Sequence, residues 1–262
     1  TAEENQTAIG TVTATDADGD DLTFTVSGSE LSITSAGVLT FATAPDYETQ
    51  TSYSATVTVS DGTNTATQDI TVNVTDANDP PTFTSNATFS AAENQTAIGT
   101  VTASDPEGDT LSFTISGSDI TIVSSSGLLE FASAPDFETQ TSYSATVTVS
   151  DGTNTVTQDI TVNVTNVNDV APEFTSNATF SAEENQTAIG TVTATDAEGD
   201  DVTFTVSGSE LEITSAGVLT FATAPDYETV TSFTATVTAS DGTNSTTQDI
   251  TVNVTNVNDN SP

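Results

Sequence analysis

The chain has 262 residues, of which 38 are Asp or Glu, and it contains no Lys, Arg, His or Cys, so its formal net charge is −38. A surface with this charge repels phosphate backbones and anionic lipids, which excludes nucleic acids and membrane surfaces as expected partners. Without Cys, neither a disulfide nor a thiolate metal site can stabilise the fold. No apolar stretch approaches the length of a bilayer span, so direct membrane insertion is not expected.

Short strands and turns are predicted to alternate from the N-terminus onward. Apolar residues such as Phe24 and Val26 alternate with Thr, and this period of two is typical of half-buried strands. No helical periodicity extends over the length of an ordinary helix, so the pattern predicts an all-β chain. In chain order, a turn at 16–20 precedes a strand at 22–26, turns at 27–29 and 36–37 precede a strand at 53–59, and a turn at 61–64 precedes a strand at 70–74.

The sequence repeats itself. The segment Glu-Asn-Gln-Thr-Ala-Ile-Gly that begins at Glu4 returns at Glu93 and at Glu184, with offsets of about 90 residues, the scale of a small domain. The number and spacing of short strands in each unit are typical of a β-sandwich with about seven strands. The predicted domains are repeat 1 (1–79), repeat 2 (80–169) and repeat 3 (170–259), and 260–262 would begin a linker to a following repeat.

Repeats 2 and 3 open with a strand that repeat 1 does not contain. The sequence Phe-Thr-Ser-Asn-Ala-Thr-Phe occupies 83–89 and again 174–180, whereas repeat 1 begins after the corresponding position. We therefore expect the chain to be a window of a longer repetitive protein. We also expect repeat 1 to have an unfilled sheet edge.

Acidic residues recur at fixed places in every repeat. Two carboxylates 4 Å apart repel by about 4 kcal/mol at an effective dielectric of about 20, which is large against a folding stability of about 5–15 kcal/mol. A single Asp before Gly is usually a turn former, but the recurrence of the clusters favours a bound cation. Ca²⁺ takes carboxylate, amide and carbonyl oxygens, whereas Zn²⁺ and copper prefer His or Cys. Glu30, Glu130 and Glu212 are interpreted as solvated surface residues instead.

The motifs, taken in order, resemble those of cadherin repeats over essentially the entire chain, and the bacterial cadherin-like tandem repeats of large surface proteins are most similar. The motifs are an early Glu-Asn, an Asp-x-Asp loop, an Asp-x-Glu loop, an Asp-Gly turn and a closing Asp-x-Asn-Asp linker. The resemblance implies seven-stranded Greek-key sandwiches of the cadherin/Ig-like type, arranged as an elongated rod. It also implies several Ca²⁺ ions at each junction between repeats.

The resemblance assigns metal ligands residue by residue. The first junction would use Glu4, Asp46, Glu48, Asp76, Asn78, Asp79, Asp105, Glu107 and Asp151. The second junction would use Glu93, Asp136, Glu138, Asn168, Asp169, Asp196, Glu198 and Asp241. Half-sites would remain at the ends, with Asp16, Asp18 and Asp61 at one and Glu184, Asp226, Glu228, Asn258 and Asp259 at the other.

Three departures from the family pattern concern the two linkers and one loop. The first linker is one residue shorter than the second, which leaves one backbone-carbonyl ligand open. Asn166 stands where the first linker has Asp76, so the second junction carries one negative charge fewer there. The second Asp of the Asp-x-Asp loop is a longer Glu at positions 107 and 198, which still offers oxygen.

The predicted function is a calcium-rigidified structural rod or stalk of a repetitive surface protein, adhesin or filament, located extracellularly or on a bacterial cell surface. Its expected partners are further copies of the repeat joined head to tail. One alternative is a filament subunit with lateral self-association, and another is a glycan-binding module, although the chain has no Trp and only 4 Tyr to form a sugar platform. Catalysis is not expected, because only paired carboxylates are available and they recur at every joint.

Overall fold

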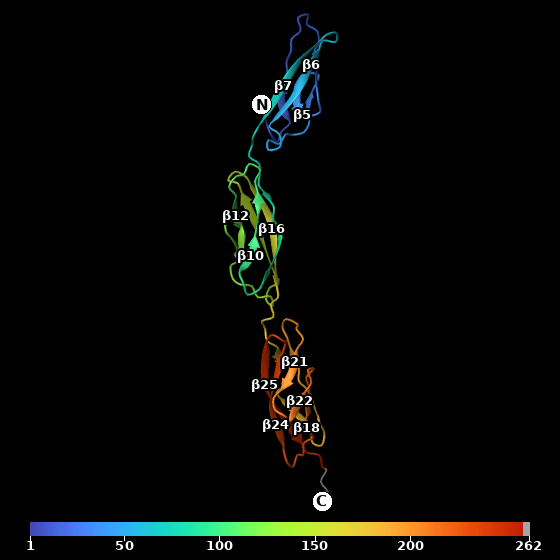
Figure 1. Ribbon diagram of the computed structural model, residues 1–262, viewed down its shortest axis with the longest axis vertical. Coiled ribbons are helices and arrows are strands. Elements are labelled where there is room, and N and C mark those ends of the chain that lie inside the picture. Colours follow the sequence, from blue (N-terminus) through green and yellow to red (C-terminus); the bar gives the residue numbers. More distant parts are fainter. Residues whose placement is uncertain (259–262) are drawn as a thin grey trace. The chain divides into compact units, whose positions relative to one another are not determined.

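The computed structural model describes residues 1–258, and strands are the regular elements throughout this range (Figure 1). The sheets follow one another in tandem as sandwich-like groups, which confirms the predicted all-β class. Within the described range there is no helix with the length and hydropathy needed to cross a bilayer. Asp259 and the predicted linker 260–262 lie outside the described residues.

Repeat 1 contributes two sheets. The four-stranded sheet contains, in order, β1 (Ala2–Glu3), β7 (Thr65–Thr75), β6 (Ser52–Ser60) and β3 (Thr23–Val26). The three-stranded sheet contains β2 (Ala8–Thr11), β5 (Val38–Phe41) and β4 (Leu31–Ile33). β6 and β7 pair along their common length as an antiparallel hairpin, whereas the short β1 runs parallel to β7.

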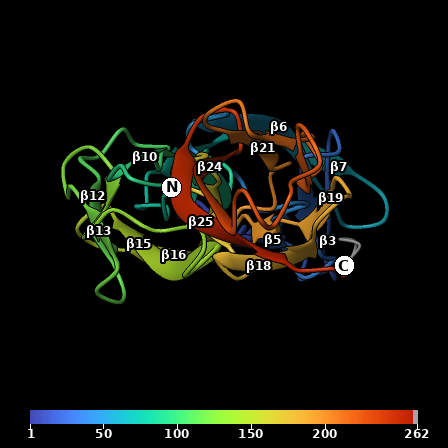
Figure 2. The same cartoon turned by 90° about the horizontal axis from the view of Figure 1, so that it is seen from below.

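Repeat 3 has the same arrangement with a longer edge strand. Its four-stranded sheet contains β18 (Thr179–Glu183), β25 (Ser245–Thr255), β24 (Ser232–Ser240) and β21 (Thr203–Val206). Its three-stranded sheet contains β19 (Ala188–Thr191), β23 (Val218–Phe221) and β22 (Leu211–Ile213). An extra pair joins β17 (Glu173–Phe174) to β20 (Ala194–Thr195). β24 and β25 lie side by side (Figure 2).

Repeat 2 has the same strand order. The boundary between the two compact units of the chain, however, falls within this repeat. Its strands are β8 (Thr82–Phe83), β9 (Thr88–Ala92), β10 (Ala97–Thr100), β11 (Ala103–Ser104), β12 (Ser112–Ile115), β13 (Ile120–Ile122), β14 (Leu128–Phe131), β15 (Ser142–Ser150) and β16 (Thr155–Thr165). One compact unit comprises 1–89, 98–130 and 144–161, and the other comprises 90–97, 131–143 and the chain from 162 onward. The predicted domain limits at 79, 169 and 259 stay predictions.

The period-two pattern places one set of side chains in each core. In repeat 3, Val237, Ile250 and Val252 are at most 1% exposed, and burying such a side chain contributes roughly 1.5–3 kcal/mol. The Thr residues between them face outward, where the Thr236 hydroxyl donates to the Asp249 carboxylate across the strands at 2.7 Å. The alternation in the sequence therefore separates core from surface, as predicted.

One glycine in each repeat allows a turn to approach the backbone of an earlier segment closely. Gly217 has a φ of +85°, and an added Cβ would lie 2.2 Å from the Val192 carbonyl oxygen. Gly37 makes the same close approach to the Val12 carbonyl, at 2.3 Å. Only glycine fits these positions, because both the left-handed backbone and the close contact disfavour any side chain.

Candidate metal centre

Each repeat buries one glutamate near its linker. Glu4, Glu93 and Glu184 are only 2–3% exposed. In repeat 2, one carboxylate oxygen of Glu93 accepts a hydrogen bond from the Phe137 N–H at 2.7 Å, and the other accepts from the Val167 N–H at 2.7 Å. The glutamate therefore joins the Asp-x-Glu loop to the start of the linker. The equivalent donors are Tyr47 and Ala77 for Glu4, and Tyr227 and Val257 for Glu184.

The asparagine after each buried glutamate sets the local backbone. Asn5 and Asn94 have φ values of 60° and 61°, a left-handed conformation that Asn tolerates better than most residues. The Asn94 side chain then donates to the Asp169 carboxylate at 2.6 Å, and Asn5 donates to Asp79 at 2.7 Å. The Glu-Asn motif thus directs one side chain inward and the other toward the linker aspartate.

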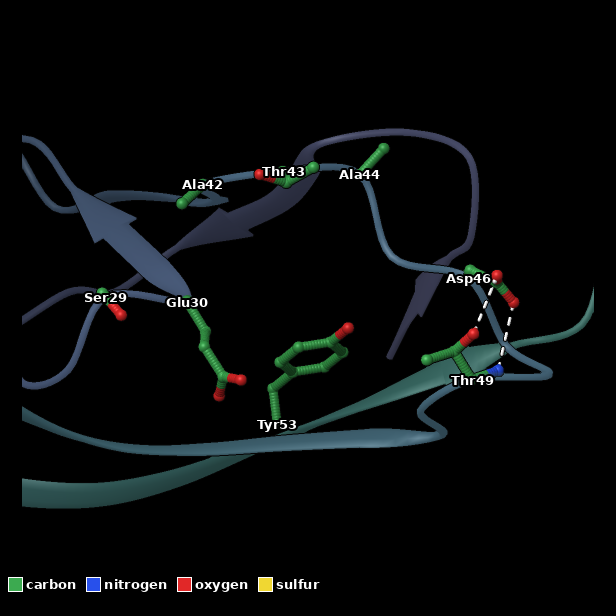
Figure 3. A pocket seen from close by; sticks show the side chains of 8 residues that line it. All are labelled: Ser29, Glu30, Ala42, Thr43, Ala44, Asp46, Thr49 and Tyr53. Carbon is green, nitrogen blue, oxygen red and sulfur yellow. Dashed lines mark hydrogen bonds between the residues drawn. The ribbon is translucent and has the colours of Figure 1, made fainter.

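In repeat 1, the Asp-x-Glu loop uses its two carboxylates, Asp46 and Glu48, differently. Asp46 accepts hydrogen bonds from the Thr49 N–H at 3.1 Å and the Thr49 hydroxyl at 2.9 Å (Figure 3). Beside this turn, Glu30, Tyr53 and neighbouring residues line a pocket of about 360 Å³ that is separate from the carboxylate clusters. Asp46 therefore stabilises its own loop, and Glu48 is the loop residue that approaches other carboxylates.

We define the first junction as the linker 76–81 with the loops that contact it, and all its residues belong to the first compact unit. Carboxylate oxygens of Glu4, Glu48 and Asp76 lie within 4.8 Å of one another, as do those of Glu48, Asp79 and Glu107. Glu48 belongs to both groups. The second group combines residues predicted to belong to repeat 1, the linker and repeat 2.

The second junction is the linker 166–172 with its contacting loops, and it lies within the second compact unit. Here four carboxylates from two repeats and the linker converge. Glu93, Glu138, Asp169 and Glu198 each offer an oxygen within 4.8 Å of the others, and a further group contains Asp196, Glu198 and Asp200. The structure thus brings together Glu93, Glu138, Asp169, Asp196 and Glu198 in two groups that share Glu198.

The Asp-Gly turn connects the following repeat to the linker. Asp151 accepts from the Thr153 N–H at 2.6 Å and from the Asn154 N–H, and its other oxygen accepts from the Asn78 side chain at 2.9 Å. At the second junction, Asp241 accepts from the backbone of its own turn in the same way. Asn168 donates there to Asp200 at 2.6 Å instead of to the Asp-Gly turn.

The two ends of the described chain differ in whether their predicted metal ligands lie close together. Glu184, Asp226 and Glu228 lie within 4.8 Å of one another, so repeat 3 alone gathers three predicted ligands. Asn258 is exposed, and Asp259 lies outside the described residues. At the other end, Asp16 and Asp61 accept hydrogen bonds within their own turns. Asp18 contributes its N–H to the Asp16 turn at 2.8 Å.

The acidic environment shifts several pKa values. Partial desolvation, and then the charges of Glu93, Glu198 and Asp136, raise the pKa of Glu138 above its ordinary value of 4.5. Glu48 shows a raised pKa for the same reasons. Hydrogen bonds from the N–H groups of Asn64 and Thr63 lower the pKa of Asp61. The turn carboxylate of Asp61 therefore favours the charged form, whereas Glu48 and Glu138 resist it.

The sequence interpretation missed three kinds of residue. Asn154 and Asn244 donate side-chain hydrogen bonds to the carbonyl oxygens of Asn78 and Asn168. Asp200 joins an acidic group, and Asn94 contacts the linker aspartate. Each occupies a position that recurs in the Asp-Gly-Thr-Asn, Gly-Asp and Glu-Asn motifs, so recurrence was the available signal.

The donor set fits a hard cation. Buried carboxylate oxygens of Asp105, Glu107, Asp196 and Asp241 have no hydrogen-bond partner among the described residues. Such an oxygen is costly to bury as a charge unless a cation compensates it. The chain itself has no Lys, Arg or His to do so. Carboxylates with nearby amide and carbonyl oxygens are the ligands that Ca²⁺ takes, at six to eight positions.

Comparison with solved structures shows cadherin-like tandem repeats. A crystal structure of mouse cadherin-23 EC22–24 matches with a TM-score of 0.64 and 23% identity, covering 97% of this chain and 94% of that one. Extracellular cadherin domains 3–6 of protocadherin gamma B2 match with a TM-score of 0.65 and 21% identity, covering 99% and 71%. At these identities the likeness establishes the fold alone.

Sequence comparison then gives the family. The family described as "Bacterial Ig domain" matches residues 1–75 and 78–165, and the chain belongs to this family. Among curated proteins, chitinase A of Pseudoalteromonas piscicida is 38% identical over 156 residues, 58% of this chain and 19% of that protein. The protocadherin-like wing polarity protein stan of Drosophila melanogaster is 32% identical over 257 residues, 83% of this chain and 7% of that protein.

The chain therefore spans only a small part of the curated relatives that it matches, 19% and 7% of their lengths. The predicted resemblance to cadherin-like tandem repeats is confirmed by the structural and sequence matches. Matches to cadherin-like and Ig-like repeats point to an adhesion or structural module.

Proposed function

We propose that Ca²⁺ bridges successive repeats at the two junctions and thereby stiffens an extracellular structural module. The observation that carries this proposal is the convergence of Glu93, Glu138, Asp169 and Glu198 within 4.8 Å. These residues come from the predicted repeat 2, the linker and the predicted repeat 3. Because the chain carries no basic side chain, the compensating cation has to come from solution.

The stiffening follows from where the ligands are located. A ligand that binds only the joined arrangement of two repeats stabilises that arrangement, by roughly 2.7 kcal/mol at a concentration 100 times its dissociation constant. Each junction contains two overlapping acidic groups. The two groups of the first junction share Glu48, and the two groups of the second junction share Glu198. This supports more than one ion per junction. The preassembled group at Glu184 supports the same connection to a further repeat, head to tail.

We place this module at an extracellular or cell-surface location, as a rod or stalk segment of a larger repetitive protein in bacteria. The membership in a bacterial Ig family supports this location, as does the likeness to extracellular cadherin domains. The match to chitinase A covers 19% of that protein, and we propose that the present chain supplies a structural part without catalytic activity.

Lateral self-association is a second candidate. One similar structure, of protocadherin gammaB7 EC3–6, is described as a cis-dimer, and this supports a side-by-side arrangement here. Near-identical repeats would present the same surface at intervals, so weak contacts could add. Cations would have to screen the charge of −38. Sedimentation velocity over a range of Ca²⁺ and protein concentrations would detect such dimers, and a constant monomer would exclude them.

Small-angle X-ray scattering tests the main proposal. Adding EDTA to the calcium-loaded chain should shorten the maximum dimension and increase the flexibility of the particle. The double variant Glu138→Gln/Glu198→Gln should show this behaviour even in Ca²⁺. The control Glu30→Gln/Glu212→Gln removes the same charge from exposed positions outside the clusters and should respond like the parent chain. A scattering profile indifferent to EDTA contradicts the proposal.

A further inference from the structure

Repeat 1 carries a pocket of about 360 Å³ whose shape is set by an aromatic ring between two carboxylates. Glu30 and Asp46 lie on either side of the Tyr53 ring, and the small side chains of 42–44 complete the wall (Figure 3). Tyr53 lies on β6 beyond the point where β3 ends. Because Glu30 follows β3 in the chain, the pocket lies on the β3 side of β6, away from β7.

The lining of this pocket is fixed by contacts with the core and the backbone. The Tyr53 ring packs edge-on against the buried Phe41, with 5.0 Å between ring centroids. The Ala42 N–H donates to the Glu30 carbonyl at 2.9 Å, which holds the base of Glu30 against the wall. The Thr49 hydroxyl donates to Asp46 at 2.9 Å. The ring and the two carboxylates are therefore presented in a defined arrangement.

The same set of residues recurs in repeats 2 and 3. Tyr143 and Phe233 take the place of Tyr53, and their rings lie 5.1 and 5.2 Å from Phe131 and Phe221. The counterparts of Glu30, Asp46 and 42–44 are Asp119, Asp136 and 132–134 in repeat 2, and Glu210, Asp226 and 222–224 in repeat 3. Each repeat thus combines an aromatic ring, two acids and small side chains, at intervals of about 90 residues.

The chemistry of the pocket suits an organic cation better than a metal ion. Glu30 belongs to none of the acidic groups whose carboxylate oxygens lie within 4.8 Å of one another, so the crowded oxygens that Ca²⁺ requires do not surround it. A guanidinium group is flat, stacks on aromatic faces and pairs with carboxylates through fixed N–H donors. The chain has no Lys or Arg, so such a cation comes from another molecule.

We propose that this pocket binds an arginine side chain of a basic partner protein, with the guanidinium stacked on Tyr53 and hydrogen-bonded to Glu30. Asp46 adds negative charge at the other end of the ring. The partner is a different protein, because a second copy of these repeats brings no arginine. The net charge of −38 attracts a basic partner over long range, and the pocket gives the contact a specific position.

The proposal does not depend on calcium at the junctions. Glu30 and Tyr53 belong to no acidic group of either junction, so arginine should bind in Ca²⁺ and in EDTA. Absence of a calcium effect on the particle shape would leave the pocket proposal standing. Absence of arginine binding would likewise leave the junction proposal standing.

Nuclear magnetic resonance of the full chain with ¹³C-labelled tyrosine tests the site, because the chain has only 4 Tyr. On titration with N-acetyl-arginine amide at constant ionic strength, the ring signals of Tyr53 and Tyr143 should shift to saturation. Those of Tyr47 and Tyr227 should not, because the pocket lining includes Tyr53 and not Tyr47, and Tyr227 is the counterpart of Tyr47. An unchanged Tyr53 signal overturns the proposal.

Three further ligands identify the chemical class. The citrulline amide has nearly the same shape as the arginine amide without its charge, and it should bind at least about fivefold more weakly. The lysine amide should also bind more weakly, because an ammonium group neither stacks flat nor donates through a fork. Equal affinity for citrulline or lysine overturns the assignment to arginine. A stronger response to methyl glucoside would identify a sugar site instead and overturn it as well.

Two variants with the same loss of charge locate the binding. Glu30→Gln should weaken arginine binding at Tyr53 by at least about fivefold and leave the Tyr143 response unchanged. Asp21→Asn removes one charge from an exposed loop of the same repeat outside the pocket, and it should leave binding at Tyr53 unchanged. Equal weakening by both variants would show diffuse attraction to the acidic surface and would overturn the site.

Discussion

The two junctions contain the same kinds of carboxylate, yet their linkers supply different backbone donors. At the second junction, the N–H groups of Asp169 and Val170 donate to the two oxygens of Glu198, at 3.0 and 3.2 Å. At the first junction, Asp79 donates to one oxygen of Glu107 at 3.1 Å, and the following residue is Pro80, which has no N–H. The other oxygen of Glu107 is buried without a partner among the described residues.

One linker residue therefore determines whether one or both oxygens of this recurring glutamate accept a backbone N–H. An oxygen that already accepts a backbone N–H retains lone pairs but is partly compensated, whereas the free oxygen of Glu107 depends on a cation. Glu107 should therefore depend more strongly on a bound cation than Glu198 does.

Removal of calcium should have the largest effect. Each proposed site would contribute roughly 2.7 kcal/mol at a Ca²⁺ concentration 100 times its dissociation constant, so EDTA should lower the melting temperature by many degrees in differential scanning calorimetry. Sodium chloride screens the exposed charges without occupying the sites. A sodium chloride buffer of matched ionic strength that restored the full melting temperature would show that screening, and not binding, explains the effect.

Glu93→Ala should have the next largest effect, because it leaves two backbone donors unpaired. Each buried donor left without a partner costs about 1–3 kcal/mol, and the variant also removes a candidate ligand. Urea unfolding with and without Ca²⁺ measures both losses. Glu184→Ala removes the equivalent two hydrogen bonds in repeat 3. In metal-free buffer it should therefore lose a similar amount of unfolding free energy. If Glu93→Ala left the calcium response intact, Glu93 would not belong to the site.

Exchanging the residue after the linker aspartate should have a smaller effect and sharpens the comparison directly. Pro80→Val supplies the missing N–H to Glu107 and should stabilise the metal-free first junction by about 1 kcal/mol. Val170→Pro removes the donor to Glu198 and should destabilise the second junction by a similar amount. Hydrogen exchange in EDTA, read separately at the loops of each junction, measures these changes. Equal protection in both variants would refute the role given to this residue.

The pH dependence should be the smallest effect, and its sign should depend on calcium. The raised pKa of Glu48 and Glu138 means that the folded state binds more protons than the unfolded state just above pH 4.5. The metal-free chain should therefore lose stability as the pH rises through this interval and regain it as the pH falls. With Ca²⁺ the slope should reverse, because protons compete for the ligands.

Urea unfolding in steps of pH, in EDTA and in Ca²⁺, measures the two slopes. The lowered pKa of Asp61 acts in a separate interval below its ordinary value of 3.8, where stability is lost as the pH falls. Glu138→Gln should reduce the difference between the slopes. The same slope in both buffers would contradict the link between these glutamates and calcium.

The sequence predicted the fold because alternation and recurrence are local signals. Val237 and Ile250 alternate with Thr as buried strand residues do, and the acidic motifs recur in each repeat. The bonds of Glu93 to Phe137 and Val167 could not be predicted, because its partners lie 44 and 74 residues away. The effect of Pro80 also required the structure, since a missing donor matters only where an acceptor faces it.

A crystal grown in millimolar Ca²⁺, measured for anomalous scattering, tests the central claim most directly. The account predicts anomalous peaks coordinated by Glu138, Asp169 and Glu198 at the second junction and by Glu48, Asp79 and Glu107 at the first. Peaks absent from both junctions, or bound only by carboxylates of a single repeat, would contradict it.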